Sequence, residues 1–144
     1  GGELFVAGRA GERFAVRNSG ATAVVEGTGD HACEYMTNGV VVILGPTGNN
    51  LGAGMSGGQA FVYDPSSEVL AKVNRQLVEA RRPDGFHLDR LSELVQRHAT
   101  LTGSRRAAEL LADWARMADD FWLVAPKTEL ERVAAAESSR RATA

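Results

Sequence analysis

The sequence has little of what a disulfide, a membrane span or a nucleic-acid contact requires. It has one cysteine in 144 residues, which excludes an internal disulfide and fits a reducing compartment. No apolar run approaches the ~18 residues that cross a bilayer, and a net charge of -2 gives no case for a basic nucleic-acid-binding face. We therefore expect a cytoplasmic protein with no membrane partner and no nucleic-acid partner.

The first residues of the chain lack a secretory leader and an initiator methionine. The segment 1–20 has neither the basic start nor the apolar centre of a secretory leader, and Gly1 stands where an initiator Met is expected. The second absence indicates a processed chain or a piece of a longer one. Glycine is scarce later in the chain, since 14 of the 16 glycines precede residue 59. Charge is distributed the other way, with nine charged residues in 1–64 and 25 in 65–144. This contrast divides the chain into a glycine-rich part, 1–64, and a part expected to be helical, 65–144.

The glycine-rich part repeats. Four short runs of apolar residues each follow a leading glycine, and these glycines are 18, 19 and 19 residues apart: Gly2, Gly20, Gly39 and Gly58. A second recurring feature, a glycine followed by a polar residue, has the same spacing: Gly11-Glu12, Gly29-Asp30 and Gly48-Asn49. Self-similarity at this period is typical of a solenoid that adds one coil per repeat.

The connections between the runs decide how the strands pair. Hairpin strands can be joined by two residues, whereas these runs are separated by about a dozen, the length of a crossover between parallel strands. The connections are rich in Gly, Asn, Asp and Ser and show no helical period. The sequence therefore predicts a right-handed parallel β-helix of about four coils over 1–64.

In such a coil, equivalent side chains stack in columns about 4.8 Å apart. The most uniform column is wholly β-branched and is predicted to face inward: Val6, Val24, Ile43 and Val62. The neighbouring columns are less uniform, for example Leu4, Thr22, Val41 and Ala60.

The second part, 65–144, is expected to be helical. The run 64–68 ends the last strand and can cap a short helical or irregular segment near 69–74, whereas 77–82 is ambiguous. Apolar residues then recur at helical spacing: Leu88, Leu91, Leu94, Val95, His98 and Leu101. Ser104 is the predicted N-cap of the next helix, whose apolar stripe is Ala107, Leu110, Leu111, Trp114, Met117, Ala118 and Phe121. Thr128 and Glu131 form a capping box, and the chain past Ala136 is expected to fray.

The two parts are expected to form one structural unit. The last coil of a β-helix exposes unpaired strand groups, which such proteins cover with an atypical terminal element. We expect the helical part to be that cover. Nothing covers the first coil, because the repeat is already under way at Gly2. Its edge either pairs with a second copy or continues into an upstream segment, and we favour the second.

Several motifs resemble sites of chemistry. The run 52–57 matches G-x-G-x-x-G, but that motif binds a dinucleotide only when it opens a helix, and a strand is expected here. The run 30–34 holds Asp30, His31, Cys33 and Glu34, yet a zinc site needs a second pair of ligands and no other cysteine exists. Cys33 and His31 lack a nameable orienting group and oxyanion donors. Trp114, Phe121 and Trp122 are interpreted as packing, and His98 as a buried or bordering histidine. The residues alone therefore predict no catalytic, cofactor-binding or metal-ligating site.

A family resemblance is carried by longer motifs. The run 11–20, the pair Glu26-Gly27 with 29–31, the run 34–37 and the run 52–58 resemble the C-terminal glycine-rich (GXGXG) β-helix domain of the large subunit of glutamate synthase. The second part agrees through 102–104, Trp114 and 126–127, although Thr128 stands where an aromatic residue is expected. The resemblance covers nearly the whole chain.

The resemblance implies a parent enzyme of nitrogen assimilation that hydrolyses glutamine, channels ammonia and converts 2-oxoglutarate to glutamate with FMN and an iron–sulfur cluster. The nucleophilic cysteine, the FMN site and the cluster ligands belong to upstream domains of that family, and none maps onto this chain. The chain itself is then expected to be a non-catalytic scaffold between the amidotransferase and synthase domains, without a cofactor of its own. Its partners would be those domains or a separate synthase subunit.

Two alternatives remain open. A glycine-rich β-helix also occurs in a subunit of formylmethanofuran dehydrogenase, although the Thr-Gly-Ser turn at 102–104 favours glutamate synthase. The chain can also be an autonomous structural or interaction module that forms a homo-oligomer through its open coil edge.

Overall fold

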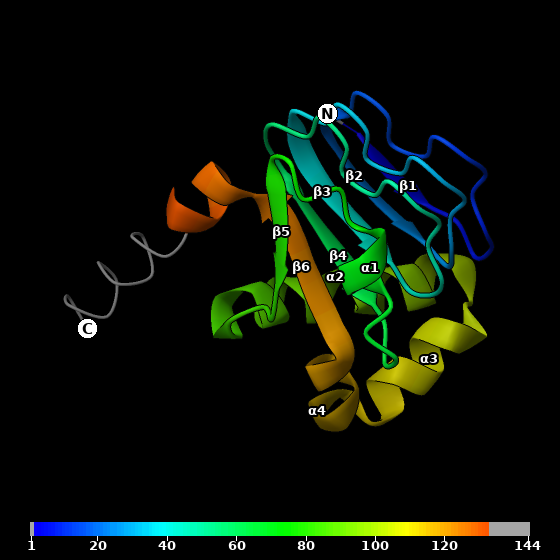
Figure 1. The fold of residues 1–144 in the computed structure, drawn as a ribbon. Helices are drawn as coiled ribbons and strands as arrows, with labels where there is room; N and C mark the ends of the chain where they lie inside the picture. The colour runs from blue at the N-terminus through cyan, green and yellow to red at the C-terminus, as the bar shows by residue number, and fades with distance from the viewer. Residues whose placement is uncertain (1, 133–144) are drawn as a thin grey trace.

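The computed structural model describes residues 2–132 and contains one six-stranded sheet (Figure 1). Its first four strands are parallel neighbours in chain order: β1 (Glu3–Phe5), β2 (Ser19–Val25), β3 (Asn38–Ile43) and β4 (Gln59–Tyr63). Two later strands, β5 (Val78–Arg81) and β6 (Phe121–Pro126), complete the order β1-β2-β3-β4-β6-β5. The predicted parallel β-helix is confirmed. Paired strand residues are 19 apart from β1 to β2, 18 apart over most of the β2–β3 pairing and 19 apart from β3 to β4, so the shorter step lies one strand later than the leading glycines indicate.

The connections form the back wall of the solenoid and bond coil to coil through the backbone. The amides of Ala10, Arg13 and Arg17 in the first coil donate to carbonyls of Gly27, Asp30 and Glu34 in the second, at 2.9, 2.9 and 2.8 Å. Within this wall every second residue has left-handed backbone, at equivalent places in three successive coils: Arg13, Ala15 and Arg17, then His31, Cys33 and Tyr35, then Asn50, Gly52 and Gly54. Glycine supplies only two of these nine positions.

At two other glycines the coils approach too closely for a side chain. A Cβ atom at Gly45 would overlap the carbonyl oxygen of Glu26, and one at Gly57 would overlap that of Thr37. Both residues lie against the preceding coil. The absence of a side chain therefore allows the coils to stack at these corners.

The predicted inward column contains one error, at β2. The register pairs Val25, not Val24, with Ile43, which in turn pairs with Val62. Val25, Ile43 and Val62 belong to the solenoid interior, whereas Val24 belongs to a second core on the opposite face. The register of β2 shifts between Ser19 and Thr22. Because side chains alternate along a strand, one extra residue moves every following side chain to the other face.

Three helices cover that second face of the sheet, α2 (Gly85–Thr102), α3 (Arg105–Ala112) and α4 (Trp114–Met117), with a short 3-10 turn at Ala118–Asp120. The short helix α1 (Val69–Lys72) packs its Val69 into the solenoid interior instead. One buried cluster joins strand and helix residues: Val24, Val42, Phe61, Leu91, Leu94, Val95 and Leu110. Both faces of the sheet are therefore buried, one inside the solenoid and one beneath the helices.

The helix caps agree with the sequence in two places. Ser104 accepts a hydrogen bond from the amide of Ala107 at 3.0 Å, which confirms it as the N-cap of α3. Asp64 directly follows β4 and accepts from the amide of Val69 at 2.6 Å, whereas the N-cap position of α1 is Glu68, whose side chain makes no capping hydrogen bond. Helix α2 begins at Gly85, earlier than the Leu88 pattern indicated, because Asp84 accepts from the amide of His87.

The element that pairs with the last coil is a strand and not a helix. The strand β6 pairs antiparallel with β4, and β5 pairs antiparallel with β6. The predicted helical stripe extends to Phe121, yet Phe121 opens β6, and the helix is already interrupted at Asp113. The run 121–126 alternates between the two cores, so pairing satisfies the open backbone groups of β4 and buries both of its faces. A last helical segment follows at 127–132, and the expected fraying past Ala136 lies outside the described residues.

Candidate functional site

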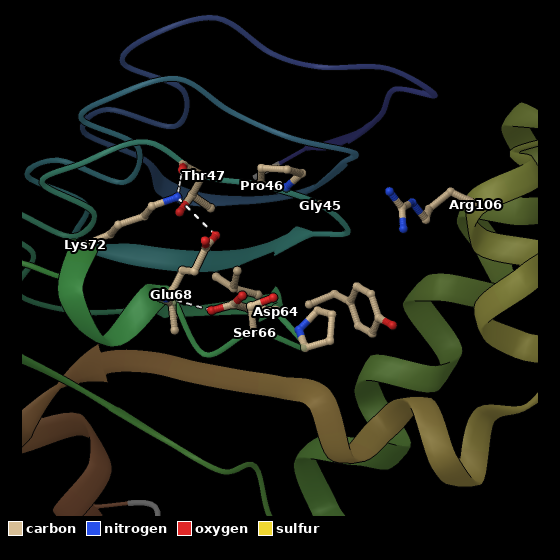
Figure 2. A pocket seen from close by; sticks show the side chains of 12 residues that line it. Gly45, Pro46, Thr47, Asp64, Ser66, Glu68, Lys72 and Arg106 are labelled. Atoms are coloured by element: carbon tan, nitrogen blue, oxygen red, sulfur yellow. Dashed lines mark hydrogen bonds and ion pairs between the residues drawn. The ribbon is translucent and has the colours of Figure 1, made fainter.

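A pocket of about 210 Å³ lies where β4 ends and α1 begins (Figure 2). Its wall combines the turn after β3, the segment between β4 and α1, and one residue of α3: Gly45, Pro46, Thr47, Val62, Tyr63, Asp64, Pro65, Ser66, Glu68, Val69, Lys72 and Arg106. Lys72 Nζ donates to the carbonyl oxygen of Thr47 at 2.8 Å and lies 3.8 Å from Glu68 Oε2. Arg106 lines the pocket from α3.

The polar groups of this pocket are mostly occupied. Asp64 accepts from the amide of Val69, and Lys72 holds the Thr47 carbonyl against α1. No nucleophile–base pair is formed among the lining side chains whose contacts the structure describes. Arg106 adds a guanidinium from α3 to this wall, in which Asp64 and Lys72 already have partners.

A second feature is the open edge of the first coil. Strand β1 pairs only with β2, and it ends the sheet. Leu4 is 49% exposed and Val6 is 36% exposed, whereas Val41 and Ile43 in the third coil are fully buried. The solenoid interior is therefore open to solvent at this end.

An ion pair fixes this edge to a helix. Arg97 of α2 donates to both carboxylate oxygens of Glu3, at 2.5 and 2.7 Å, and its guanidinium lies 5.1 Å from the centre of the Phe5 ring. The hydrogen bond from Arg97 lowers the pKa of the Glu3 carboxyl. Both side chains are partly exposed, so the pair orients the first strand more than it stabilises it.

A buried polar network joins the second coil to the turn between α2 and α3. His98 is fully buried, and its Nε2 lies 3.0 Å from Oε2 of Glu26. Ser104 Oγ donates to the same oxygen at 2.8 Å and accepts from the amide of Ala107. Serine, histidine and carboxylate are all present, but the carboxylate lies between the other two. Ser104 Oγ therefore contacts the carboxylate and not the imidazole, so these residues do not form the serine–histidine–carboxylate order of a catalytic triad.

The second histidine of α2 is also held in place. His87 Nδ1 lies 2.8 Å from Asp84 Oδ1, and its Nε2 lies 3.4 Å from Nε2 of Gln59. Burial is the largest single influence on Asp84 and raises its pKa. The amide of His87, the charge and ring hydrogen bond of His87, and the amide of Phe86 together outweigh it, so the pKa of Asp84 is lowered.

The sequence motifs considered for chemistry have other partners. His31 Nδ1 lies 2.9 Å from Glu34 Oε2, and Asp30 accepts from the amide of Asn49 at 2.7 Å. Cys33 is fully buried, and burial raises the pKa of its thiol to about 12, so it is not a ready nucleophile. Within residues 2–132, no group of three or more His, Cys, Asp or Glu side chains is placed to hold a metal ion. The G-x-G-x-x-G run 52–57 is followed by β4, as expected, and not by a helix.

No helix in the described part of the chain is both long enough and apolar enough to cross a membrane.

Comparison with known proteins decides the family. The model of the GXGXG motif matches residues 1–127. The chain belongs to the GXGXG-motif family. It is 50% identical over 132 residues to the ferredoxin-dependent glutamate synthase of Spinacia oleracea, which covers 90% of this chain and 8% of that protein. It is 53% identical over 133 residues to the NADPH glutamate synthase large chain of Azospirillum brasilense, covering 92% and 9%. The resemblance to the GXGXG domain of glutamate synthase is confirmed.

The GXGXG chain spans less than a tenth of the length of these relatives. The NADH glutamate synthase of Schizosaccharomyces pombe, 51% identical over 138 residues, is covered over 6% of its length. The family match extends through β6, which ends at Pro126. The solenoid and its antiparallel strands therefore belong to one family unit.

Sequence reasoning missed the two buried histidine clusters of this GXGXG chain. In the sequence Glu26 stands out only as part of a motif, and its partners His98 and Ser104 are 72 and 78 residues away. The one local signal was His98 on an apolar stripe, which indicates a buried histidine in need of a partner. Nothing in the sequence names that partner.

Proposed function

We propose that this chain is the structural domain of a glutamate synthase large subunit, where it holds the amidotransferase and synthase domains in register. The identity of about 50% to glutamate synthases over some 90% of the chain carries this proposal. The chain contributes a rigid solenoid with two buried faces. Conversion of glutamine and 2-oxoglutarate to glutamate, with FMN and an iron–sulfur cluster, takes place in the other domains of a cytoplasmic enzyme.

The open edge of the first coil supports the proposal that a further protein segment packs against this scaffold. Its interior side chains Leu4 and Val6 and its unpaired strand edge match what an adjoining coil would cover. The pocket beside α1, with Arg106, is a second place where a neighbouring domain can dock. Upstream domains of the same polypeptide, or a separate synthase subunit, are the proposed partners.

The same open edge favours one alternative, an autonomous module that self-associates through β1. The relatives described above are glutamate synthases, which favours that parent over a formylmethanofuran dehydrogenase. Sedimentation of the isolated chain tests self-association directly.

The proposal is tested by dividing the parent polypeptide. We expect the isolated chain to show no FMN absorbance and no glutamine hydrolysis. We expect the large subunit without this segment to lose glutamine-dependent glutamate formation, while co-expression of the segment restores part of it. A flavin that copurifies with the isolated chain, or full coupled activity without the segment, would contradict a scaffold role.

A further inference from the structure

Left-handed residues of the back wall differ in where their side chains lie. Ala15 packs against the solenoid interior and Cys33 lies within it, so burial of these side chains offsets the unfavourable backbone. Two residues further along the same coils, Arg17 and Tyr35 have φ of 58° and 55°, and both are exposed to solvent. Arg13, with φ of 60°, is exposed as well. We call Arg13, Arg17 and Tyr35 the arginine–tyrosine patch.

The third coil shows that this part of the wall does not need a side chain. Gly54 stands where the first and second coils have Arg17 and Tyr35, and its φ is 67°. Glycine adopts this backbone without the clash that the Cβ atom of an L-residue meets. A side chain at such a position therefore lowers the stability of the folded chain unless its contacts offset the clash.

The patch makes few such contacts. The side chains of Arg13 and Arg17 form no hydrogen bond or ion pair with any residue in 2–132. Tyr35 is 54% exposed. Its ring lies against Gly54, where a Cβ atom would overlap it, and its hydroxyl has no partner among the described residues. Strain that the chain itself does not compensate indicates that these side chains act on something outside it.

Other exposed left-handed residues of the wall do not raise the same question. His31 has a partner in the chain, because its Nδ1 lies 2.9 Å from Glu34 Oε2. Asn50 belongs to a residue type that adopts left-handed backbone at little cost. The unexplained side chains are therefore those of the arginine–tyrosine patch.

The backbone beneath the patch is held by the stacked coils. The amides of Arg13 and Arg17 donate to carbonyls of the second coil at 2.9 and 2.8 Å, and the amide of Tyr35 donates to Ala53 at 2.8 Å. A fixed backbone reduces the entropy that is lost when a partner binds. Arginine and tyrosine are also the residue types that are enriched among the anchors of protein interfaces. The patch therefore has the composition and the rigidity of a docking surface.

The free donors of the patch indicate the chemistry of its partner. A guanidinium carries five N–H donors and no acceptor, and it binds a carboxylate through two parallel hydrogen bonds. Carboxylates of the same wall do not take this role within the chain. Asp30 accepts from the amide of Asn49, Glu34 pairs with His31, and the stem of Glu12 lies toward Gly29. The matching carboxylates are therefore expected on another surface.

We infer that the arginine–tyrosine patch docks a neighbouring domain of the parent large subunit, whose surface presents carboxylates to Arg13 and Arg17 and an apolar contact to the ring of Tyr35. This inference rests on the proposed scaffold function. It adds the face of the solenoid at which a domain is held, namely the outer face of the back wall and not the open edge of β1.

Hydroxyl-radical footprinting tests whether the patch is covered in the parent protein. Tyrosine is oxidised readily by hydroxyl radicals, so the oxidation rate of Tyr35 measures its exposure. In the isolated chain we expect the rate of an exposed tyrosine, and in the intact large subunit we expect a rate several-fold lower. Equal rates in the two samples would overturn the inference.

Substitution separates docking from stability. Arg13→Gly combined with Arg17→Gly is expected to raise the melting temperature of the isolated chain by a few degrees, because left-handed strain is relieved. The same change is expected to weaken binding of the chain to a large subunit that lacks this segment, roughly tenfold. The control R75Q/R90Q removes two exposed arginines from other surfaces and should leave this affinity unchanged.

A second variant guards against an effect of folding. Tyr35→Asn removes the ring but keeps a residue type that tolerates left-handed backbone, and it should also weaken binding. Calorimetric titration of each variant into the truncated large subunit measures the affinities, and thermal melts of the isolated chains measure the stabilities. A more stable R13G/R17G chain that binds less tightly cannot owe its weaker binding to unfolding.

Failure of the inference and failure of the scaffold proposal give different results. If the wild-type chain binds the truncated subunit and both R13G/R17G and Y35N bind equally well, the chain docks through another face and the inference is wrong. If the wild-type chain does not bind and the truncated subunit keeps full coupled activity, the scaffold proposal itself is wrong.

Discussion

Left-handed backbone at residues other than glycine is the main local cost in this solenoid. Seven of the nine left-handed positions of the back wall carry a side chain, from Arg13 in the first coil to Asn50 in the third. Each left-handed L-residue costs about 1–2 kcal/mol relative to ordinary backbone. The stacked coils impose this backbone, because the amides of the wall donate to carbonyls of adjoining coils.

Glycine at such a position should stabilise the chain. We expect Arg13→Gly to raise the free energy of unfolding by about 0.5–1 kcal/mol, since relief of the left-handed strain exceeds the extra entropy of the unfolded chain. Arg9→Gly removes the same charge from the same coil at a residue without left-handed backbone, and it should lower that free energy. Urea unfolding of both variants measures the difference, and a destabilised R13G would show that the wall is not strained there.

The Glu26 network predicts a larger loss. Glu26→Ala leaves His98, which is fully buried, without its partner, and leaves Ser104 without its acceptor. We expect a loss of about 2 kcal/mol in the free energy of unfolding. The control Glu34→Ala removes a carboxylate that pairs with the partly exposed His31, and it should cost less than about 1 kcal/mol. Similar losses in the two variants would contradict the structural role of the buried network.

At the scale of single elements, helix α2 depends on its cap. Asp84 accepts from the amide and ring of His87, and its pKa is lowered from 3.8 in the folded chain. A carboxyl with a depressed folded pKa contributes stability above its unfolded pKa and loses it as pH falls through the folded value. The difference in unfolding free energy between wild type and Asp84→Asn is therefore expected to be largest above about pH 5 and to shrink below pH 4. Urea titrations from pH 3 to pH 7 measure it, and a difference that grows on acidification would contradict the assignment.

Strand β6 is the element that closes the stack, and its centre is a direct test of that role. Val124 pairs with Ala60 on one side and with Ala80 on the other. Proline there removes a backbone donor from a central strand and leaves a buried carbonyl acceptor unpaired, at a cost of about 1–3 kcal/mol. We expect Val124→Pro to expose the edge of β4 and to aggregate on mild heating, as measured by light scattering. The control Glu79→Pro lies in the edge strand β5 and should aggregate less.

The elements that the sequence predicted are those whose signal is local. The period of 18 and 19 residues identifies β2, β3 and β4, and Ser104 identifies the start of α3, because each signal lies within one repeat or one turn. The partner of β6 lies some 60 residues upstream, and Phe121 continued a helical apolar spacing, so its strand was missed. The predicted inward column was wrong only at β2. The register shift before Thr22 does not change the hydrophobicity pattern of the sequence, so the sequence shows no sign of it. No sequence signal connects Glu26 to His98, so this part of the site required the structure.

At the scale of the whole molecule, the solenoid and the helices share their cores. Val124 of β6 packs with Val41 and Ile43 inside the solenoid, while Leu91 and Leu110 pack with Phe61 on the other face. Each of the two buried clusters contains residues from both 2–64 and 65–132. We therefore predict that the two parts unfold together, in one calorimetric transition whose calorimetric and van't Hoff enthalpies agree. Two separate transitions, or a folded fragment 1–64, would show that the parts are independent domains.

The antiparallel pairing of β6 with β4 gives the stack a direction. A strand that runs backward and is itself covered by β5 offers no parallel template, so no further coil can follow β4 in the same manner. At the other end of the sheet, β1 is parallel to β2 and its outer edge can still pair with another parallel strand. Whole repeats can therefore be added to such a solenoid beyond β1, while the pairing of β4 with β6 at the other end stays the same.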